Sequence, residues 1–166
     1  MPIRPALALT LLLAAVPLPA PMGLAQTGGV RFGGLRQDPS LPVEVTAESL
    51  TVSQADGSAT YEGNVVVGQG EMRLAAATVV VEFDGPQRRI ARLRASGGVT
   101  LATGTDAAEA REAVYTIDEG RIVLEGDVLL TQGGTAISGD RLVIDLAAGT
   151  GSIEGGVETV FTPGGN

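Results

Sequence analysis

The chain has 166 residues, with 11 Lys plus Arg, 19 Asp plus Glu and a formal net charge of −8. It contains no Cys and no His, which excludes nucleophile pairs that need histidine and zinc sites built from thiolates or imidazoles. The acidic balance argues against a nucleic-acid partner, because neutralising phosphates requires a basic surface.

The first 25 residues have the pattern of a secretory signal peptide. Arg4 supplies a thin positive region, residues 6–16 form an apolar core, and Ala25 is a small residue before the expected cleavage site. A membrane anchor is the alternative, but the apolar run falls short of the roughly 20 residues that span a bilayer. We therefore predict cleavage after Ala25, which leaves an exported chain of 141 residues with a net charge of −9.

Residues 26–42 are rich in Gly, Pro and polar residues without a sustained period, which predicts a flexible N-terminal segment. From residue 43 to residue 161, short β-branched runs alternate with Gly, Asp and Asn, the pattern of a single all-β domain. Residues 162–166 are expected to form a flexible tail. The predicted strands, in chain order, are residues 43–52, 58–67, 71–76, 78–84, 90–95, 99–102, 109–118, 121–125, 128–131, 135–138, 141–146 and 152–161.

Short polar segments that favour hairpin turns separate many of these strands. They end in glycines, which tolerate positive φ angles; these are Gly57, Gly70, Gly120, Gly134 and Gly149. Residues 102–113 are rich in Ala and Glu and are the one helix candidate. We predict instead a loop over residues 104–107 and then a strand, because residues 114–117 align with residues 143–146 at an offset of 29.

A four-residue pattern built on Gly and Val occurs four times. The copies are Glu62-Gly63-Asn64-Val65, Ser96-Gly97-Gly98-Val99, Glu125-Gly126-Asp127-Val128 and Glu154-Gly155-Gly156-Val157. Their first glycines lie 34, 29 and 29 residues apart, and the longest interval contains Pro86, where we predict an inserted loop over residues 84–89. Such spacing indicates stacked units that bury their apolar faces on one another. We interpret the glycines as backbone devices for a bulge or tight turn.

Alternation within the predicted strands gathers aliphatic side chains on one face of the sheet. Val65 and Val67 share a face, whereas Arg92 and Arg94 point away from the face that carries Leu93. A sheet that curls such rows inward encloses an aliphatic interior, although the rows could equally form the core of a closed sandwich. Alternation leaves open which of residues 114–117 face inward, because apolar side chains occupy both parities.

Residues 61–70 (Tyr-Glu-Gly-Asn-Val-Val-Val-Gly-Gln-Gly), followed by Leu74, Ala76 and residues 79–81, resemble the core motif of the OstA-like family. The resemblance continues upstream through residues 42–50 and downstream through residues 125–128 and 137–140, so that it covers about residues 42–160. The chain departs from the family pattern in having no Lys and in placing Ala77 where an Asp is often found.

The resemblance implies an elongated, slightly twisted β-jellyroll of repeated antiparallel strands, open at both ends. Its apolar interior would hold the acyl chains of lipopolysaccharide and carry the lipid through the periplasm from the inner to the outer membrane. The partners implied are lipopolysaccharide, LptC of the inner-membrane complex at the N-terminal edge, and the N-terminal domain of LptD or a second copy of the chain at the C-terminal edge. An unblocked strand edge is itself a template for strand addition.

The residues expected in these roles fall into two groups. The lipid-binding interior comprises Val65, Val67, Leu74, Val79, Val81, Phe83, Leu93, Val99, Leu101, Ile117, Leu124, Val128, Leu130, Leu142, Ile144 and Leu146. The partner-binding edges comprise Val43, Val45, Leu50, Val52, Ile153, Val157 and Val160.

Two alternatives stay open. The chain could be a structural β-repeat scaffold of an envelope complex that carries no lipid. The arginines Arg73, Arg88, Arg89, Arg92 and Arg94 could meet lipid phosphates, or could form a solvated outer face. No pair of acidic residues stands out as catalytic, so we expect no enzyme activity, no metal and no cofactor.

Overall fold

The computed structural model describes residues 30–31, 38 and 40–162, which form an all-β structure. The predicted signal peptide and the C-terminal residues 163–166 lie outside the described residues. No helix in the described part of the chain is long and apolar enough to cross a membrane. The strands are β1 (Val30–Arg31), β2 (Glu44–Thr46), β3 (Ser49–Val52), β4 (Ala59–Gln69), β5 (Met72–Asp84), β6 (Arg89–Thr103), β7 (Asp106–Thr116), β8 (Arg121–Gln132), β9 (Thr135–Asp145), β10 (Thr150–Glu154) and β11 (Glu158–Phe161).

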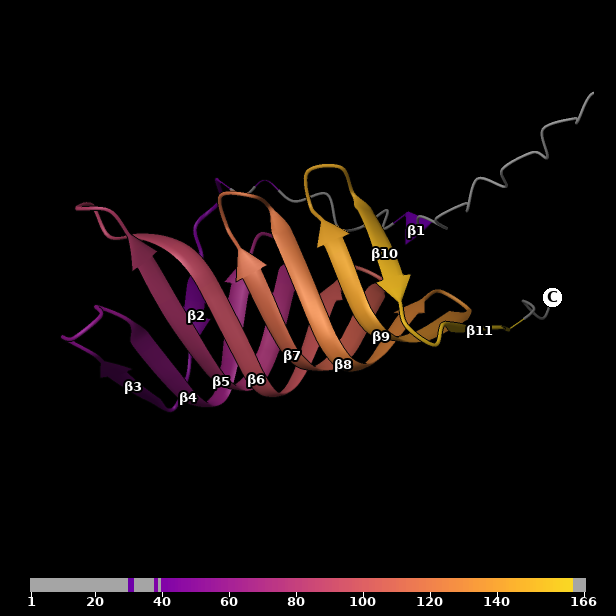
Figure 1. Cartoon of the computed structure of the whole chain (residues 1–166), viewed down its shortest axis with the longest axis horizontal. Coiled ribbons are helices and arrows are strands. Elements are labelled where there is room, and N and C mark those ends of the chain that lie inside the picture. Colours follow the sequence, from indigo (N-terminus) through magenta and orange to yellow (C-terminus); the bar gives the residue numbers. More distant parts are fainter. Residues whose placement is uncertain (1–29, 32–37, 39, 163–166) are drawn as a thin grey trace, which may run out of the picture.

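All eleven strands belong to one antiparallel sheet in the order β1-β10-β9-β8-β7-β6-β5-β4-β2, with β3 also pairing with β4 and β11 with β9. Strands β4 to β9 follow one another as a meander of hairpins. The predicted all-β jellyroll is therefore confirmed, and its elongated form follows from the stacking of sequential hairpins (Figure 1).

The sheet is folded over along its length, so that each long strand contributes to two walls. Figure 1 shows the strands curving round at the bottom of the view from one layer into the other. At the N-terminal end, β3 pairs with residues 59–62 of β4 and β2 pairs with residues 66–68 of the same strand. At the C-terminal end, β10 and β11 likewise pair with the two halves of β9. We call the wall that contains β3 and β10 wall A, and the wall that contains β2 and β11 wall B.

The walls meet at a line of β-bulges, which we call the fold line. Gly63 and Asn64 of β4 both have positive φ angles, 82° and 46°, and together they stand opposite Ala77 of β5. The same arrangement places residues 97–98 against residue 111, and residues 126–127 against residue 140. Consecutive left-handed residues bend a strand sharply, and glycine adopts that conformation at least cost. The repeated pattern is thus the bend of the sheet, as the interpretation of the glycines as backbone devices predicts.

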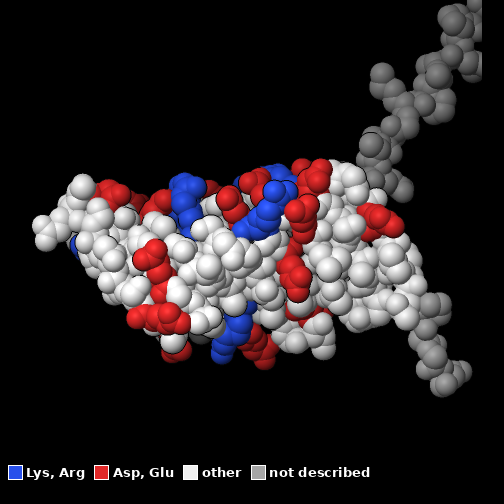
Figure 2. Space-filling model, turned by 90° about the horizontal axis from the view of Figure 1, so that it is seen from below, with Lys and Arg blue, Asp and Glu red and all other residues white. Residues whose placement is uncertain are grey.

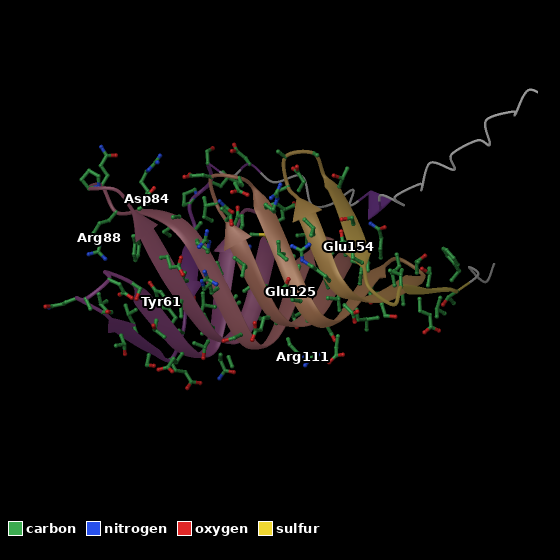
Figure 3. The ribbon with its side chains drawn as sticks, viewed as in Figure 1. Tyr61, Asp84, Arg88, Arg111, Glu125 and Glu154 are labelled. Atoms are coloured by element: carbon green, nitrogen blue, oxygen red, sulfur yellow. The ribbon has the colours of Figure 1, made fainter. Side chains whose placement is uncertain are left out.

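The glycines are also required by close packing across the fold line. A Cβ atom at Gly97 would lie 2.6 Å from the Cβ of Ala77, and one at Gly126 would lie 2.6 Å from Nε of Arg111. Figure 3 shows Arg111 at the lower margin of the molecule, where the strands turn. The side chain opposite each bulge therefore occupies the space that a larger residue at the glycine would need.

The structure differs from the sequence prediction in how the strands are divided. Runs predicted as separate strands, such as residues 90–95 and 99–102, are the two halves of one continuous strand that bends at the fold line. The predicted single strands 43–52 and 152–161 are each split in two for the same reason. Strand β7 begins at Asp106, inside the predicted loop 104–107.

The longest repeat interval does not contain a long loop. Strands β5 and β6 are 13 and 15 residues long, whereas β7 has 11 residues. Most of the additional residues in this repeat interval therefore lengthen the two strands of the β5–β6 hairpin. The turn between them covers only residues 85–88. Within the segment predicted as flexible, Val30–Arg31 form β1 and pair with β10.

Gly97→Ala should destabilise the protein more than Gly98→Ala, although the two glycines have almost equal φ angles of 84° and 86°. Both variants carry the cost of an alanine in the left-handed region, about 1–2 kcal/mol. Only Gly97→Ala adds a clash, since a Cβ at Gly98 would have no atom within 4 Å; overpacking typically costs a further 1–3 kcal/mol, roughly. Urea unfolding of both variants measures the difference, and equal losses would contradict the role assigned to close packing.

Candidate functional site

The interior between the walls is lined by apolar side chains from every long strand. Fourteen of the sixteen residues predicted there are buried, and the remaining two, Phe83 and Ile117, are partly buried and pack against them. Among residues 114–117, whose orientation alternation does not decide, Tyr115 and Ile117 face inward and Val114 lies on the outer side. Interior residues that the sequence reasoning did not name are Ala59, Met72, Ala76, Ala95, Ala108, Ala110, Ala113, Tyr115 and Ile122.

These side chains fill the space between the walls. Val65, Leu124 and Ile144 have no exposed surface. A gap between the walls, lined by residues that include Leu101, Leu130 and Ile144, measures only about 10 Å³, room for a single water molecule at most. An acyl chain can therefore enter this interior only if the walls move apart, or if it displaces side chains from their present contacts.

Four polar side chains stand at the border of wall B that lies furthest from the fold line. Gln69, Thr103 and Asp106 are 1%, 1% and 6% exposed, and Gln132 is partly buried. Each occupies the inward-facing position at the end of its strand, next to a hairpin turn. We call this row the polar lip; the sequence reasoning missed it, although the alternation Val65, Val67, Gln69 already places a polar residue at the end of an apolar row.

The polar lip is held by hydrogen bonds. The hydroxyl of Tyr115, which comes from wall A, donates to Oε1 of Gln69 at 2.7 Å, and Nε2 of Gln69 donates to the carbonyl oxygen of Leu41 at 2.9 Å. Within wall B, Nε2 of Gln132 donates to Oδ2 of Asp106 at 2.9 Å. The Tyr115–Gln69 bond therefore ties the two walls together, and burial raises the pKa of the Tyr115 hydroxyl to about 12. Among the described residues, Oγ1 of Thr103 is buried without a hydrogen-bond partner.

The two ends of the sheet expose apolar side chains. Leu50 and Val52 of β3 are 53% and 55% exposed, and Val157 and Val160 at the other end are 53% and 57% exposed. The other three residues predicted at the edges, Val43, Val45 and Ile153, are partly buried and pack against the core instead, because their positions continue the inward-facing rows. At the C-terminal end, β1 pairs with the first two residues of β10, Thr150 and Gly151. Within the described residues, the only strand that pairs with β11 is β9.

The arginines considered as phosphate contacts are mostly engaged by the chain itself. Arg92 and Arg94 pair with Glu82 on the outer side of wall A, and Arg73 donates to backbone carbonyls of its own hairpin. Arg88 donates to the carbonyl oxygen of Gly57 and lies 5.0 Å from the ring centre of Phe83. Figure 3 places Arg88 beside the tip of the β5–β6 hairpin, near Asp84. Figure 2, a view of the fold-line side, shows acidic and basic side chains scattered over a largely uncharged surface.

A folded-over antiparallel sheet with an aliphatic interior and exposed strands at both ends defines a β-jellyroll of the kind that stacks hairpin repeats. Residues 44–150 match the model of the family described as LptA/(LptD N-terminal domain) LPS transport protein, and the chain belongs to this family.

Two relatives are found among the curated proteins. The lipopolysaccharide export system protein LptH of Pseudomonas aeruginosa is 28% identical over 141 residues, which cover 77% of each chain. An uncharacterized protein of Rhizobium meliloti is 25% identical over 143 residues, 81% of this chain and 77% of that protein. The crystal structure of LptH, described as the LptA homologous periplasmic component of the lipopolysaccharide transport device of P. aeruginosa, superposes with a TM-score of 0.68. At 21% identity it covers 76% of this chain and 99% of that one, and it shares the fold.

Tyr115→Phe should lower the free energy of unfolding by about 1 kcal/mol at neutral pH, because it removes the hydrogen bond between the walls. The wild-type protein should lose a further 2–3 kcal/mol, roughly, as the pH rises from 10 to about 12. In that range the tyrosine ionises in the unfolded chain but stays protonated in the folded one, so the folded state binds more protons and stability falls.

The variant lacks this loss and should become the more stable protein above about pH 11. Chemical unfolding at a series of alkaline pH values measures the crossing, with Tyr61→Phe, at a partly buried position, as the control. A stability difference that stays constant from pH 7 to pH 12 would show that Tyr115 is not protected in the folded state.

Proposed function

We propose that this protein is a periplasmic bridge that binds lipopolysaccharide and passes it from the inner toward the outer membrane. The observation that carries the proposal is the aliphatic interior, to which every strand from β4 to β9 contributes buried residues. Acyl chains between the walls would leave water with a gain of about 0.8 kcal/mol for each buried CH₂. Export through a signal peptide cleaved after Ala25 places the protein in the compartment where this lipid must cross.

The proposed carriage requires the walls to part on the side opposite the fold line. The bulges join the walls at the fold line through the backbone, whereas the opposite side is joined by side chains, with the Tyr115–Gln69 hydrogen bond among them. Opening at that side exposes the interior and leaves the sugar headgroup in water. The chain has no glycine-rich nucleotide-binding loop, so a partner supplies the energy for directed movement.

The ends of the sheet are the proposed docking edges. LptC would add a strand at the N-terminal edge formed by β2 and β3, and the N-terminal domain of LptD or a second copy of the chain would add one at β11. Support comes from the four exposed aliphatic side chains at these ends and from the absence of Pro and Lys within β3 and β11.

A structural scaffold is the second candidate, and one observation favours it. The interior side chains already fill the space between the walls, so the fold does not need a lipid to satisfy its apolar surface. A protein of this kind would hold an envelope complex together through its edges and would never expose its interior.

Photo-crosslinking distinguishes carriage from a scaffold. A photoreactive residue at Val67, which is 2% exposed, should capture lipopolysaccharide, whereas one at Val66 on the opposite face of β4, 40% exposed, should not. The matched pair differs by one position in the same strand, so both residues lie at the same place along the sheet, and circular dichroism of each variant checks that it folds. Capture at neither position by the folded, exported protein would refute carriage and leave the scaffold.

Lysine substitutions test the docking edges. Leu50→Lys and Val160→Lys should each weaken end-to-end self-association by tenfold or more, because a charge must be desolvated when a strand is added to the edge. Leu129→Lys, 39% exposed on β8 and separated from the C-terminal edge strand β11 by β9, is the control. Sedimentation at a series of protein concentrations measures the association, and equal behaviour of all three variants would argue against edge pairing.

A further inference from the structure

We propose that the polar lip is the subsite that recognises the linkage between acyl chains and sugar in the bound lipid. The chemical class of ligand is a sugar acylated through ester or amide bonds, whose carbonyl oxygens lie at the boundary between apolar chains and polar headgroup. This inference rests on the proposed lipid carriage. It adds the residues that determine how far the lipid enters the space between the walls.

The position of the lip supports this role. Along β6 the inward-facing residues of wall B run Val99, Leu101, Thr103, so the apolar row ends in a hydroxyl group at the border of the wall. Along β8 the corresponding row ends in Gln132. A lipid whose chains lie along these rows with its headgroup outside has its ester or amide carbonyls at the depth of the lip.

The opposite border is apolar. The inward-facing positions nearest that border of wall A are occupied by Phe83, Ile90, Ile117 and Leu146, all buried or packed against the core. Polar groups of a ligand would therefore find hydrogen-bond partners mainly on wall B, apart from the hydroxyl of Tyr115. The two walls thus give the ligand a preferred orientation about its long axis.

The hydrogen bonds of the lip explain why a carbonyl is needed. When the walls part, the bond from Tyr115 to Gln69 breaks, and a buried polar group left without a partner carries a large desolvation cost. A carbonyl oxygen accepts from the Tyr115 hydroxyl or from the Thr103 hydroxyl, which is 1% exposed, borders the small gap between the walls and has no partner among the described residues. A ligand whose chain and sugar are joined only by an ether oxygen offers these donors a weaker acceptor.

The test compares two disaccharide amphiphiles with chains of equal length, sucrose monolaurate, which has an ester carbonyl, and dodecyl maltoside, which has none. Calorimetry on the purified mature chain, below the micelle concentration of each, should give tighter binding of sucrose monolaurate by about 2- to 10-fold, the value of one net hydrogen bond. Thr103→Val, which keeps the side-chain shape, should reduce the preference, and Thr103→Val combined with Tyr115→Phe should abolish it, without weakening the binding of dodecyl maltoside.

Thr100→Val is the matched control, because Thr100 lies in the same strand but is exposed on the outer face. It should keep the preference of the wild-type protein. The thermal midpoint of Thr103→Val should be no lower than that of the wild type, since the change removes an unpaired buried hydroxyl and not a contact.

Equal affinity of the wild-type protein for both amphiphiles, or a preference that survives in the double variant, would overturn the inference while leaving lipid carriage intact. Lipopolysaccharide itself is included as a third ligand. If it binds and neither amphiphile does, the lip subsite is refuted alone. If nothing binds, lipid carriage and the subsite are refuted together.

Discussion

The structure depends on a backbone constraint that recurs at every second strand, namely two left-handed residues placed opposite one residue of the neighbouring strand. At Gly126 and Asp127, with φ angles of 84° and 49°, β8 turns from one wall into the other while Asp140 alone faces the pair from β9. Because each long strand bends at the same level, one sheet supplies both walls of the interior. No disulfide and no helix is then needed to cover the apolar face, in a chain whose sequence has no Cys and only 3% aromatic residues.

The bend also decides which side chains face inward. The strands with two residues at the bend keep the parity of their inward-facing positions, as Leu93 and Val99 show in β6. The strands with a single residue at the bend reverse it, as in β5, where Leu74 and Ala76 give way to Val79 and Val81. A register slip of one residue would turn a whole row to solvent, so the bulges fix the register as well as the shape.

Because the bulges fix the register, features that depend on where they lie are harder to predict from the sequence than the all-β repeat itself. The recurrence of Gly and Val predicts a stacked all-β repeat, and alternation is sufficient to place Val67 or Ile144 inside. Alternation does not predict that Tyr115 faces inward. The inward-facing positions of β7 change from even to odd numbers at residues 111–112, because β7 has a single residue at the bend, and the sequence does not show which strands have one residue there. Alternation also missed the polar lip, since a Gln or Thr next to a hairpin glycine has the usual composition of a turn.

A protein whose interior is filled by its own side chains is compatible with a carrier function, because its two walls are held together strongly at one border and weakly at the other. At the fold line the walls are joined covalently by six bent strands, whereas at the lip the described contacts between them are dispersion contacts and the hydrogen bond from Tyr115 to Gln69, each contributing about 1 kcal/mol or less. Many of the interior side chains are alanine or valine, so each pair of facing residues loses little when separated. In the proposed carriage, an acyl chain between the walls would make comparable contacts, and the apolar surface of the walls would stay covered in both states. The same weak side-chain contacts that hold the walls together would therefore be the ones that a lipid replaces under this proposal.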